Sequence, residues 1–547
     1  MKNRAKWVSG KPAIENRVVH IDLKGPKIPF DSFKGFIQLL GRWGINGVLV
    51  EYEHRFPRLP LKHQFPSADR YTKSQLNELM KIAKDNGIEW IPLFQTFGHL
   101  EYLSRLKGTK DMFENPDYIQ QLCPLNEKAR QYIQNLIEIA CEFHPESKYI
   151  HVGQDETFQL GFCNQCKTEV EKNGKMSLYL KHTNWVWEQV KKYGKKPMFW
   201  NDMFFSKSSV EYLSHIPHDV IPVVWQYEDT SDISHDVIFD GIRISKIDAR
   251  HLYKMPVYGN VVARFAKKGN FFEDLPEKIK NIIGIDKKTG YPKSFSQLRI
   301  TSRYNKNFWA TCATYNCSDM LFSPSFIRGL FNPVSMVKTV IELGGKGIIA
   351  SNWARAHSYA PISPPWTLNF YNIAHFACAS YTGKTSSEDL KEIGKLIAEE
   401  IKVPWRYGEF SLDDILWVIS ADAPGPGNIQ KLHQLTEILN LLKTKCCDSV
   451  FGRGLLISVE AQLLYVKLLF LQEEARWWNS TKNEIPVMIK KDMKKRFLQI
   501  CREIASLEKK TKFYYTQCVG DKKSFNTWWK GLFELDTYLT EQAISFL

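Results

Sequence analysis

Several features are missing from this 547-residue chain, and each absence excludes a class of protein. No uninterrupted apolar run reaches about 18 residues, so the sequence predicts no membrane-spanning helix. The charged stretch from Met1 to Trp7 leads into no apolar segment, so no secretory signal is visible and we expect a cytoplasmic or nuclear protein. The first predicted strand is not followed by a Gly-rich phosphate turn, which disfavours a doubly wound nucleotide-binding sheet.

Metal-ligand patterns are also scarce. The eleven cysteines are spread over the chain, and only Cys163 and Cys166 have metal-ligand spacing, without a second pair or a neighbouring histidine. This motif alone leaves open whether the two thiols pair, bind a metal or stay reduced. A metal-dependent barrel hydrolase would need a His-x-His pair or a bridging lysine at the strand ends, and neither is present among its candidate ligands His20, Asp22, His99 and His151. We therefore expect no metal and no cofactor.

The positive charge of the chain does not form one block. Lysine and arginine exceed aspartate and glutamate by 74 to 59, a net charge of +15, and basic clusters are most frequent in the C-terminal third. Acidic residues such as Asp492, Glu503 and Glu508 interrupt these clusters. The pattern is typical of solvated helix faces, and binding to nucleic acid or to a membrane is not expected.

Up to about residue 383 the sequence alternates between short apolar runs and helical patterns. Helical spacing of apolar residues lies between the runs, for example over Ser32–Arg42 and Glu127–Phe143. The eight runs predicted as strands are Val18–Asp22, Gly47–Glu51, Trp90–Phe94, Tyr149–Gly153, Pro197–Trp200, Pro222–Trp225, Asn307–Thr311 and Gly347–Ser351. Eight strands that alternate with helices predict an α/β protein with a (β/α)8, or TIM, barrel.

This pattern divides the chain into three parts. Residues 1–16 form an N-terminal tail, and residues 17–383 form the barrel. Residues of about 254–305 are interpreted as an insertion between strands six and seven that could close over the site. Residues 384–547 are predicted to form an all-α C-terminal domain, because long amphipathic patterns cover Ser387–Glu400, Asn428–Lys445, Leu455–Ser480 and Ile485–Thr511.

Polar and aromatic side chains collect at the predicted strand ends, where the active site of a barrel is built. Carboxylates grouped with tryptophans are typical of a site that holds a sugar ring and breaks its acetal bond. The candidate site residues are Asp22, Glu53, His99, Asp155, Glu156, Trp200, Asp202, Trp225, Tyr315 and Trp353.

The adjacent carboxylates Asp155 and Glu156 are the strongest catalytic candidates. Neighbouring residues of a regular strand face opposite ways, so both can serve one pocket only where a strand breaks into its loop, and this pair lies at such a point. Two close carboxylates repel each other, which raises one pKa and keeps one group protonated. A protonated acid beside an ionised carboxylate is what cleavage of a glycosidic bond requires.

The run His151–Glu156 resembles the H-[IV]-G-x-D-E signature of family 20 glycoside hydrolases, the β-N-acetylhexosaminidases. Further phrases are similar to the hexosaminidase D branch of this family, in the same order over residues of about 17–383: His20–Gly25, Glu51–Glu53, Gln95–His99, Trp200–Asp202 and Asn352–Trp353.

The resemblance implies a retaining mechanism in which the acetamido group of the substrate attacks its own anomeric carbon. Asp155 would orient that group, and Glu156 would act as general acid and base. His99 would support both carboxylates, and a wall around the pocket would come from Trp200, Trp225 and Trp353. The expected partner is a glycoconjugate or oligosaccharide with a terminal β-N-acetylhexosamine, and the chain could form a homodimer.

Two positions depart from the family pattern and leave the sugar specificity open. Asp22 stands where an arginine usually follows the first strand, and Arg355 stands where a glutamate usually follows the last-strand tryptophan. The resemblance to hexosaminidase D favours GalNAc or tolerance of both GalNAc and GlcNAc. The alternatives are an O-GlcNAcase-like glycosidase and a catalytically inactive barrel that binds carbohydrate or nucleic acid.

Overall fold

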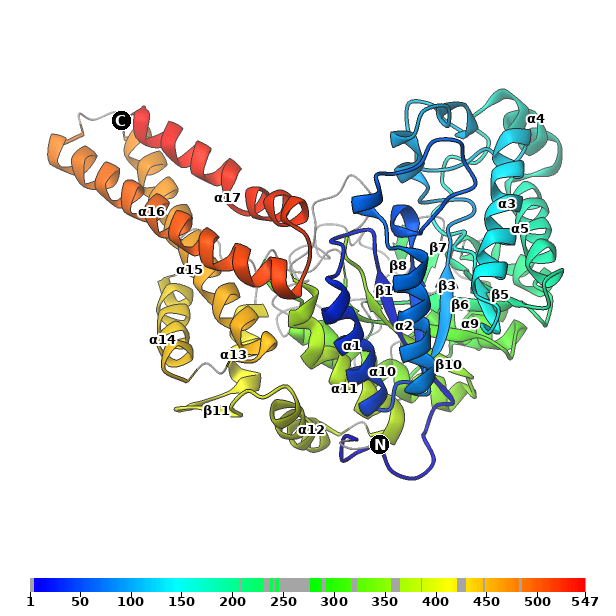
Figure 1. Cartoon of the computed structure of the whole chain (residues 1–547), viewed down its shortest axis with the longest axis horizontal. Helices are drawn as coiled ribbons and strands as arrows, with labels where there is room; N and C mark the ends of the chain where they lie inside the picture. Colours follow the sequence, from blue (N-terminus) through cyan, green and yellow to red (C-terminus); the bar gives the residue numbers. More distant parts are fainter. Residues whose placement is uncertain are drawn as a thin grey trace.

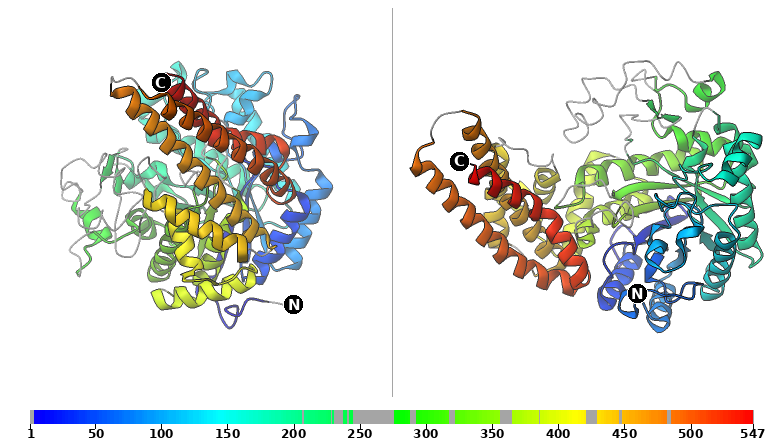
Figure 2. Two further views of the ribbon diagram at one scale, coloured as in Figure 1. Left: turned by 90° about the vertical axis from the view of Figure 1, so that its left-hand side faces the viewer. Right: turned by 90° about the horizontal axis from the view of Figure 1, so that it is seen from above.

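The structure is a computed structural model in which a barrel stands beside a set of long C-terminal helices (Figures 1 and 2). It describes residues 4–546 except 206–207, 228, 230–236, 240–241, 245–275, 288–291, 317–321, 356–364, 385, 421–428, 446–447 and 482–484.

Eight parallel strands close into a barrel in the order β1-β10-β9-β6-β5-β4-β3-β2. The strands are β1 Asn16–Asp22, β2 Gly47–Glu51, β3 Glu89–Leu93, β4 Tyr149–His151, β5 Lys196–Trp200, β6 Ile221–Trp225, β9 Trp309–Tyr315 and β10 Gly347–Asn352. The barrel closes where β1 pairs with β10, with Val18 opposite Ile349. The predicted (β/α)8 fold is confirmed, and each predicted strand overlaps an observed one.

Along each of these strands, one side chain points into the barrel interior and the next faces the surrounding helices. Val18 and Leu49 lie in a buried cluster inside the barrel, whereas their chain neighbours Val19, Val48 and Val50 belong to the larger core shared with the helices. The inner cluster also contains Ile91, Leu93, Met198, Trp200, Ile221, Val223, Trp309 and Ile349. Because both faces of each strand are buried, the strand sequences are nearly continuous apolar runs. Such runs could be recognised in the sequence.

Some helices around the barrel begin at residues whose side chains cap them. Thr72 and Gln75 form a capping box at the start of α2, and the side chain of Asn126 accepts a hydrogen bond from Ala129 at the start of α3. The helices are α1 Phe30–Arg42, α2 Lys73–Asp85, α3 Glu127–Phe143, α4 Asn164–Asn173, α5 Lys175–Lys191, α10 Phe326–Leu343 and α11 Phe370–Thr382. Short 3₁₀ helices are η1 Glu53–Arg55, η2 Ser67–Asp69, η3 Glu101–Arg105, η4 Lys110–Met112, η5 Asp202–Phe204, η6 Val210–His215 and η7 Trp366–Asn369.

The connection between β6 and β9 contains more than one βα unit. Its described parts are an antiparallel pair, β7 Val237–Phe239 and β8 Ile242–Ile244, and the helices α8 Glu277–Ile283 and α9 Ser296–Tyr304. Much of the insertion predicted over 254–305 lies outside the described residues. At its C-terminal end, α9 is buried against the barrel, where Asn201 donates a hydrogen bond to Thr301. This helix therefore serves as the crossover helix of the unit that joins β6 to β9.

The described part of the chain after residue 384 is helical apart from a small hairpin, β11 Arg406–Tyr407 with β12 Phe410–Ser411. Its helices are α12 Ser387–Glu400, α13 Leu412–Ser420, α14 Ile429–Lys445, α15 Val450–Ser480, α16 Val487–Cys518 and α17 Lys522–Ser545. Among the described residues, α15 is long and apolar enough to cross a membrane by length and composition, with a hydropathy of 1.7. However, 67% of the 18-residue segment of α15 that has this hydropathy is buried, as in the core helix of a helical domain.

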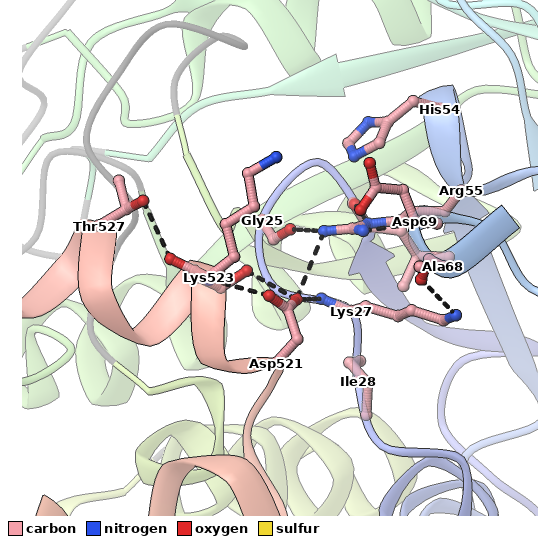
Figure 3. Close-up of polar contacts among 12 residues, drawn as sticks. Gly25, Lys27, Ile28, His54, Arg55, Ala68, Asp69, Asp521, Lys523 and Thr527 are labelled. Carbon is pink, nitrogen blue, oxygen red and sulfur yellow. Dashed lines mark hydrogen bonds and ion pairs between the residues drawn. The ribbon is translucent and has the colours of Figure 1, made fainter. Parts of the chain in front are cut away.

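The start of α17 packs on the barrel beside the loop that follows β1 (Figure 3). One carboxylate oxygen of Asp521 accepts a hydrogen bond of 3.3 Å from the Lys27 backbone and lies 4.0 Å from Nη2 of the Arg55 guanidinium. Arg55 also donates to the carbonyl of Gly25 at 2.7 Å. A Cβ on Gly520 would lie 2.3 Å from Pro26, so the close approach of the two chains requires glycine there. The contact joins the helical part of the chain to the mouth of the barrel.

Asp521 also caps α17, because it accepts a hydrogen bond of 2.9 Å from the backbone of Ser524. We expect Asp521→Ala to lower the free energy of unfolding by about 1 kcal/mol, the typical value of an N-cap. Asp521→Asn retains a good cap and removes only the charge, so it serves as the matched comparison and should lose less. Differential scanning calorimetry of both variants measures the difference, and equal unfolding temperatures for the two variants and wild type would contradict this role.

Candidate active site

The carboxyl ends of β1 to β5 meet at one mouth of the barrel, and the predicted site residues follow them. Strand β1 ends at Asp22, and β2 to β5 are followed in chain order by Glu53, His99, the pair Asp155 and Glu156, and Asp202. Residues as far apart in the sequence as His99 and Asp155 can therefore meet, since parallel strands of a closed barrel all end on the same side.

His99 joins the two adjacent carboxylates. Its Nε2 atom lies 3.3 Å from Oδ2 of Asp155 and 3.3 Å from Oε2 of Glu156. The side chains of His99 and Asp155 are each 10% exposed, whereas that of Glu156 is 37% exposed. The two carboxylates therefore differ in burial, with Asp155 inside the site and Glu156 at its opening.

The charges of the pair act on the imidazole. Burial by itself would lower the pKa of His99, but the charges and hydrogen bonds of Asp155 and Glu156 outweigh burial and hold the pKa of His99 well above its usual value. His99 is therefore a cation at neutral pH, placed between two acidic groups.

Strained backbone turns the loop after β4 so that both carboxylates reach the same space. Gly153 has a φ of 69°, and a Cβ there would lie 1.8 Å from the Gln95 side chain, so this position admits only glycine. The next residue, Gln154, has a φ of 79° and is fixed by hydrogen bonds of 3.0 Å from Trp187 and Tyr179. The left-handed turn replaces the strand alternation that would have sent the two carboxylates to opposite faces.

Left-handed backbone recurs at this barrel mouth. Among the described non-glycine residues with positive φ are Glu53 at 43°, His99 at 54° and Glu156 at 51°, each after a barrel strand. Such residues cost of order 1–3 kcal/mol each and persist where the surrounding structure imposes them, most often at functional sites. Gly98 lets the two loops approach, since a Cβ there would lie 2.3 Å from the Asp155 carbonyl oxygen.

Asp202 is a third carboxyl of this group. One of its oxygens accepts a hydrogen bond of 3.0 Å from the backbone of Glu156. Burial, reinforced by the charges of Asp155 and Glu156, holds the pKa of Asp202 well above its usual value. Burial and the two neighbouring charges therefore favour the neutral form of the Asp202 carboxyl.

One oxygen of the inner carboxylate is available to a ligand. Oδ1 of Asp155 is buried and has no hydrogen-bond partner among the residues that the structure describes. Its other oxygen already faces His99. A buried carboxylate oxygen in this state favours a bound N–H or O–H donor, because an unsatisfied polar atom costs free energy.

The predicted tryptophans lie together. Trp200 is fully buried at the end of the inner barrel cluster, and the partly buried Trp225 and Trp353 pack against that cluster. The ring centroids of Trp200 and Trp353 are 6.0 Å apart, and the Trp353 indole donates a hydrogen bond of 3.0 Å to Tyr227. Tyr315, at the end of β9, is 1% exposed. Trp225 stacks on the same Tyr227 ring, with centroids 5.5 Å apart, so Tyr227 connects Trp225 to Trp353.

A buried charge network lies beneath Trp353, and its central member, Lys24, is not among the predicted site residues. The Lys24 ammonium is 2.9 Å from Glu51 and 3.4 Å from Asp22, and it lies 4.7 Å from the centre of a Trp353 ring. Burial would lower the pKa of Lys24, but Asp22 and Glu51 raise it above its usual value, so the ammonium stays charged. A lysine two residues past the end of a buried strand was the signal available in the sequence.

Two predicted carboxylates belong to this network. Asp22 accepts hydrogen bonds from the backbones of Lys24 and Ala354, at 2.8 and 2.9 Å, so both of its oxygens are held by protein groups. Burial holds the pKa of Glu53 well above its usual value, and Glu53 and Asp22 both act electrostatically on Arg355. Arg355 therefore faces this acidic group at the rim of the site.

A pH-dependent contribution to stability follows from the raised pKa of His99. Because the folded pKa lies above the unfolded one, the contribution is fully present below the usual histidine pKa and is lost as pH rises through the folded pKa. We expect His99→Gln to cost roughly 1–3 kcal/mol at pH 6. Urea unfolding of both proteins should show this difference shrinking in alkaline buffer, and a difference that grows with pH would contradict the assignment.

A family model identifies the domain. The glycosyl hydrolase family 20 catalytic domain matches residues 54–253, a segment that contains His99, Asp155, Glu156 and Asp202. This segment of the chain is similar to a family 20 catalytic domain. The expected resemblance is thereby confirmed, and the family 20 segment holds the complete group of His99 and its carboxyl neighbours.

Two curated relatives agree with this family 20 assignment. The chain is 32% identical to hexosaminidase D of Bos taurus over 218 residues, which is 39% of this chain and 62% of the relative. It is 30% identical to hexosaminidase D of Homo sapiens over 238 residues, which is 42% of this chain and 49% of the relative. The matches therefore span about half to three-fifths of the length of these relatives.

Two solved structures resemble the chain at low identity. A mutant beta-hexosaminidase of Streptomyces plicatus in complex with GlcNAc is 12% identical, with a TM-score of 0.44, over 72% of this chain and 69% of its own. The chitobiase of Flavobacterium johnsoniae is 13% identical, with a TM-score of 0.46, over 89% of this chain and 75% of its own.

Proposed function

We propose that this protein is a β-N-acetylhexosaminidase that removes terminal, non-reducing β-linked GalNAc or GlcNAc by a substrate-assisted, retaining mechanism. The observation that carries the proposal is the graded pair, a buried Asp155 with an available oxygen beside a more exposed Glu156, both held by His99. The partner is a glycoconjugate or oligosaccharide that ends in such a sugar.

Asp155 acts on the acetamido group of the substrate. Its Oδ1 atom accepts the acetamido N–H and turns the carbonyl oxygen toward the anomeric carbon. That oxygen attacks the carbon while the glycosidic bond breaks, and positive charge grows on the acetamido nitrogen. Asp155 then stabilises this charge from a buried position, where an electrostatic interaction is stronger than in water.

Glu156 handles the proton of the leaving group. Its position at the opening suits contact with the glycosidic oxygen, to which it gives a proton as the bond breaks. Water then enters, Glu156 takes a proton from it, and the resulting attack on the anomeric carbon reopens the oxazolinium ring. The acetamido group is restored and the configuration at the anomeric carbon is retained.

The neighbours of the pair keep these roles separate. The charged His99 ring holds both carboxylates at 3.3 Å, and the backbone of Glu156 is anchored on Asp202. Burial and the charges of Asp155 and Glu156 raise the pKa of Asp202, which favours its neutral form beside the pair. The tryptophan wall covers the apolar face of the sugar ring and the acetamido methyl group.

An activity panel with p-nitrophenyl β-GlcNAc, β-GalNAc and β-glucoside tests the proposal. We expect cleavage of both N-acetylhexosaminides with release of the β-anomer, and no comparable cleavage of the glucoside, which has no acetamido nucleophile. Glucoside hydrolysis at a similar rate would overturn the substrate-assisted mechanism. Inertness toward all three sugars would favour a barrel that binds carbohydrate without cleaving it.

The aromatic wall gives a separate prediction. Trp353→Ala is expected to cost roughly 2–4 kcal/mol of transition-state binding, the scale of a lost buried aromatic contact. Steady-state kinetics with the better p-nitrophenyl substrate measure the loss in kcat/KM. Trp477→Ala is the matched control, because Trp477 is 59% exposed on α15 and should leave kcat/KM unchanged. Unaltered kcat/KM in Trp353→Ala would assign this residue to structure alone.

A further inference from the structure

Four potential metal ligands meet outside the carboxylate site. Glu114 and Cys123 lie in the loop between β3 and α3, and Cys163 and Cys166 lie at the start of α4. One ligand atom from each of the four lies within 4.8 Å of all the others. The loops of two successive βα units thus bring together a set that no single stretch of sequence contains.

The thiol separations fit coordination to one ion. Sγ of Cys123 is 3.7 Å from Sγ of Cys163 and 3.6 Å from Sγ of Cys166. Four ligands at about 2.3 Å in a tetrahedron place neighbouring sulfurs about 3.8 Å apart, which is the geometry of a structural zinc site. A disulfide bond of about 2.05 Å would need a marked approach of two sulfurs and would leave the third thiol and the carboxylate without a partner.

Glu114 is positioned as the fourth ligand. It is 0% exposed, and its Oε1 atom accepts backbone hydrogen bonds from Gly161, Phe162 and Cys163 at 3.0, 2.9 and 3.2 Å. Its Oε2 atom is buried and accepts no hydrogen bond from the described residues. One oxygen is therefore oriented by three N–H donors, and the other is left for the cluster. Outer contacts of this kind fix the ligands of metal sites.

The start of α4 prepares the Cys-x-x-Cys pair. Cys163 is the N-cap of α4, and its sulfur accepts a backbone hydrogen bond of 3.4 Å from Cys166. A helix N-terminus stabilises negative charge, and metal-binding cysteines are thiolates. The same turn therefore places both sulfurs beside Cys123.

We propose that Cys123, Cys163, Cys166 and Glu114 bind one structural Zn²⁺ ion. Sulfur donors select a soft divalent ion, and four protein ligands leave no open position for water or substrate. The ion is therefore structural and takes no part in bond cleavage. The sequence left open whether Cys163 and Cys166 bind a metal, and the proposal rests on the addition of Cys123 and Glu114 to this pair by the fold.

The ion would tie together the two loops that carry the catalytic group. The β3–α3 loop contains His99 and the β4–α4 loop contains Asp155 and Glu156, and His99 bridges them. Near the cluster the loops are joined by a hydrogen bond of 3.1 Å from the backbone of Gln159 to Gln121. Zinc at the outer ends of these loops would fix their separation, and with it the contact between His99 and the pair.

Metal analysis of the full chain tests the site and does not depend on the proposed glycosidase activity. Protein produced with zinc and dialysed against metal-free buffer should retain about one Zn²⁺ per chain by mass spectrometry. Replacement by Co²⁺ should give the visible bands of a tetrahedral thiolate complex. Cys123→Ser and Cys166→Ser should each lose the ion, and the control Cys501→Ala, in α16, should retain it.

Wild-type protein offers a second readout that needs no variant to fold. Titration with an organomercurial should release zinc in step with modification of the cluster thiols, detected with a chromogenic chelator. Binding of neither Zn²⁺ nor Co²⁺ by the wild type would overturn the proposal, as would metal content that Cys123→Ser and Cys166→Ser leave unchanged. A disulfide among the three cysteines in protein purified without oxidant would overturn it as well.

Discussion

Glu156→Gln is expected to reduce kcat/KM for a β-linked N-acetylhexosamine disaccharide by about 10²–10⁴-fold, the usual value of general acid–base assistance. The loss should be much smaller with a p-nitrophenyl glycoside, because a good leaving group departs with little protonation. Parallel kinetics on the two substrates measure the difference between them. The position of Glu156 at the opening, 37% exposed against 10% for Asp155, is the reason for giving it the leaving-group role.

A surface carboxylate in the neighbouring loop provides the control for this variant. Asp111 is 63% exposed and pairs with Lys128 at 2.9 Å, so Asp111→Asn removes a carboxylate charge without touching the pair. It should leave both substrates unaffected. If Glu156→Gln slowed the aryl glycoside as much as the disaccharide, Glu156 would not be the general acid.

Asp155→Asn is expected to slow both substrates by similar factors of roughly 10²–10³, the effect of removing one preorganised electrostatic contact from a transition state. The acetamido nitrogen gains positive charge whatever the leaving group is, so the loss of its counter-charge affects each substrate alike. A thiazoline mimic of the oxazolinium intermediate should inhibit the wild type and bind much less tightly to Asp155→Asn. Inhibition constants for the two proteins measure this directly.

Two results would contradict the role of Asp155. If Asp155→Asn spared the aryl glycoside while Glu156→Gln did not, the two roles would be reversed. Rescue of Asp155→Asn by azide, with formation of an inverted glycosyl azide, would make Asp155 an ordinary covalent nucleophile and exclude attack by the acetamido group. The Asp111→Asn control applies to this variant as well.

The barrel could be predicted from local sequence because each strand is buried on both faces. Apolar runs such as Gly47–Glu51 stand out between helical patterns, and this run coincides with β2. Helix ends could also be predicted where a capping residue precedes the helix. The predicted segment Glu127–Phe143, which follows the N-cap Asn126, coincides with α3. In contrast, the bounds of α17 were not predicted within the all-α part, although its N-cap Asp521 and buried face became clear in the structure. Between β6 and β9 the periodicity did not separate α9 from the residues before it.

The carboxylate site was predictable in its members but not in its electrostatics. The motif from His151 to Glu156 named the pair, and the strand ends named His99 and Asp202. The sequence suggested that mutual repulsion raises a pKa within the pair. In the fold, burial together with the charges of Asp155 and Glu156 raises the pKa of their neighbour Asp202 well above its usual value. The burial of a side chain depends on which distant residues pack over it, and the order of residues along the chain does not show this.

By itself, the sequence determined the eight-stranded barrel, the helical C-terminal part and the residues at the strand ends, because periodicity and strand termini are local properties. Only the tertiary structure decided which distant residues meet. Lys24 lies against Glu51 and Trp353, and Cys123 joins Cys163, forty positions along the chain. Closure of parallel strands brings their loops to one end of the barrel, and this three-dimensional proximity creates both the charge network and the thiol cluster.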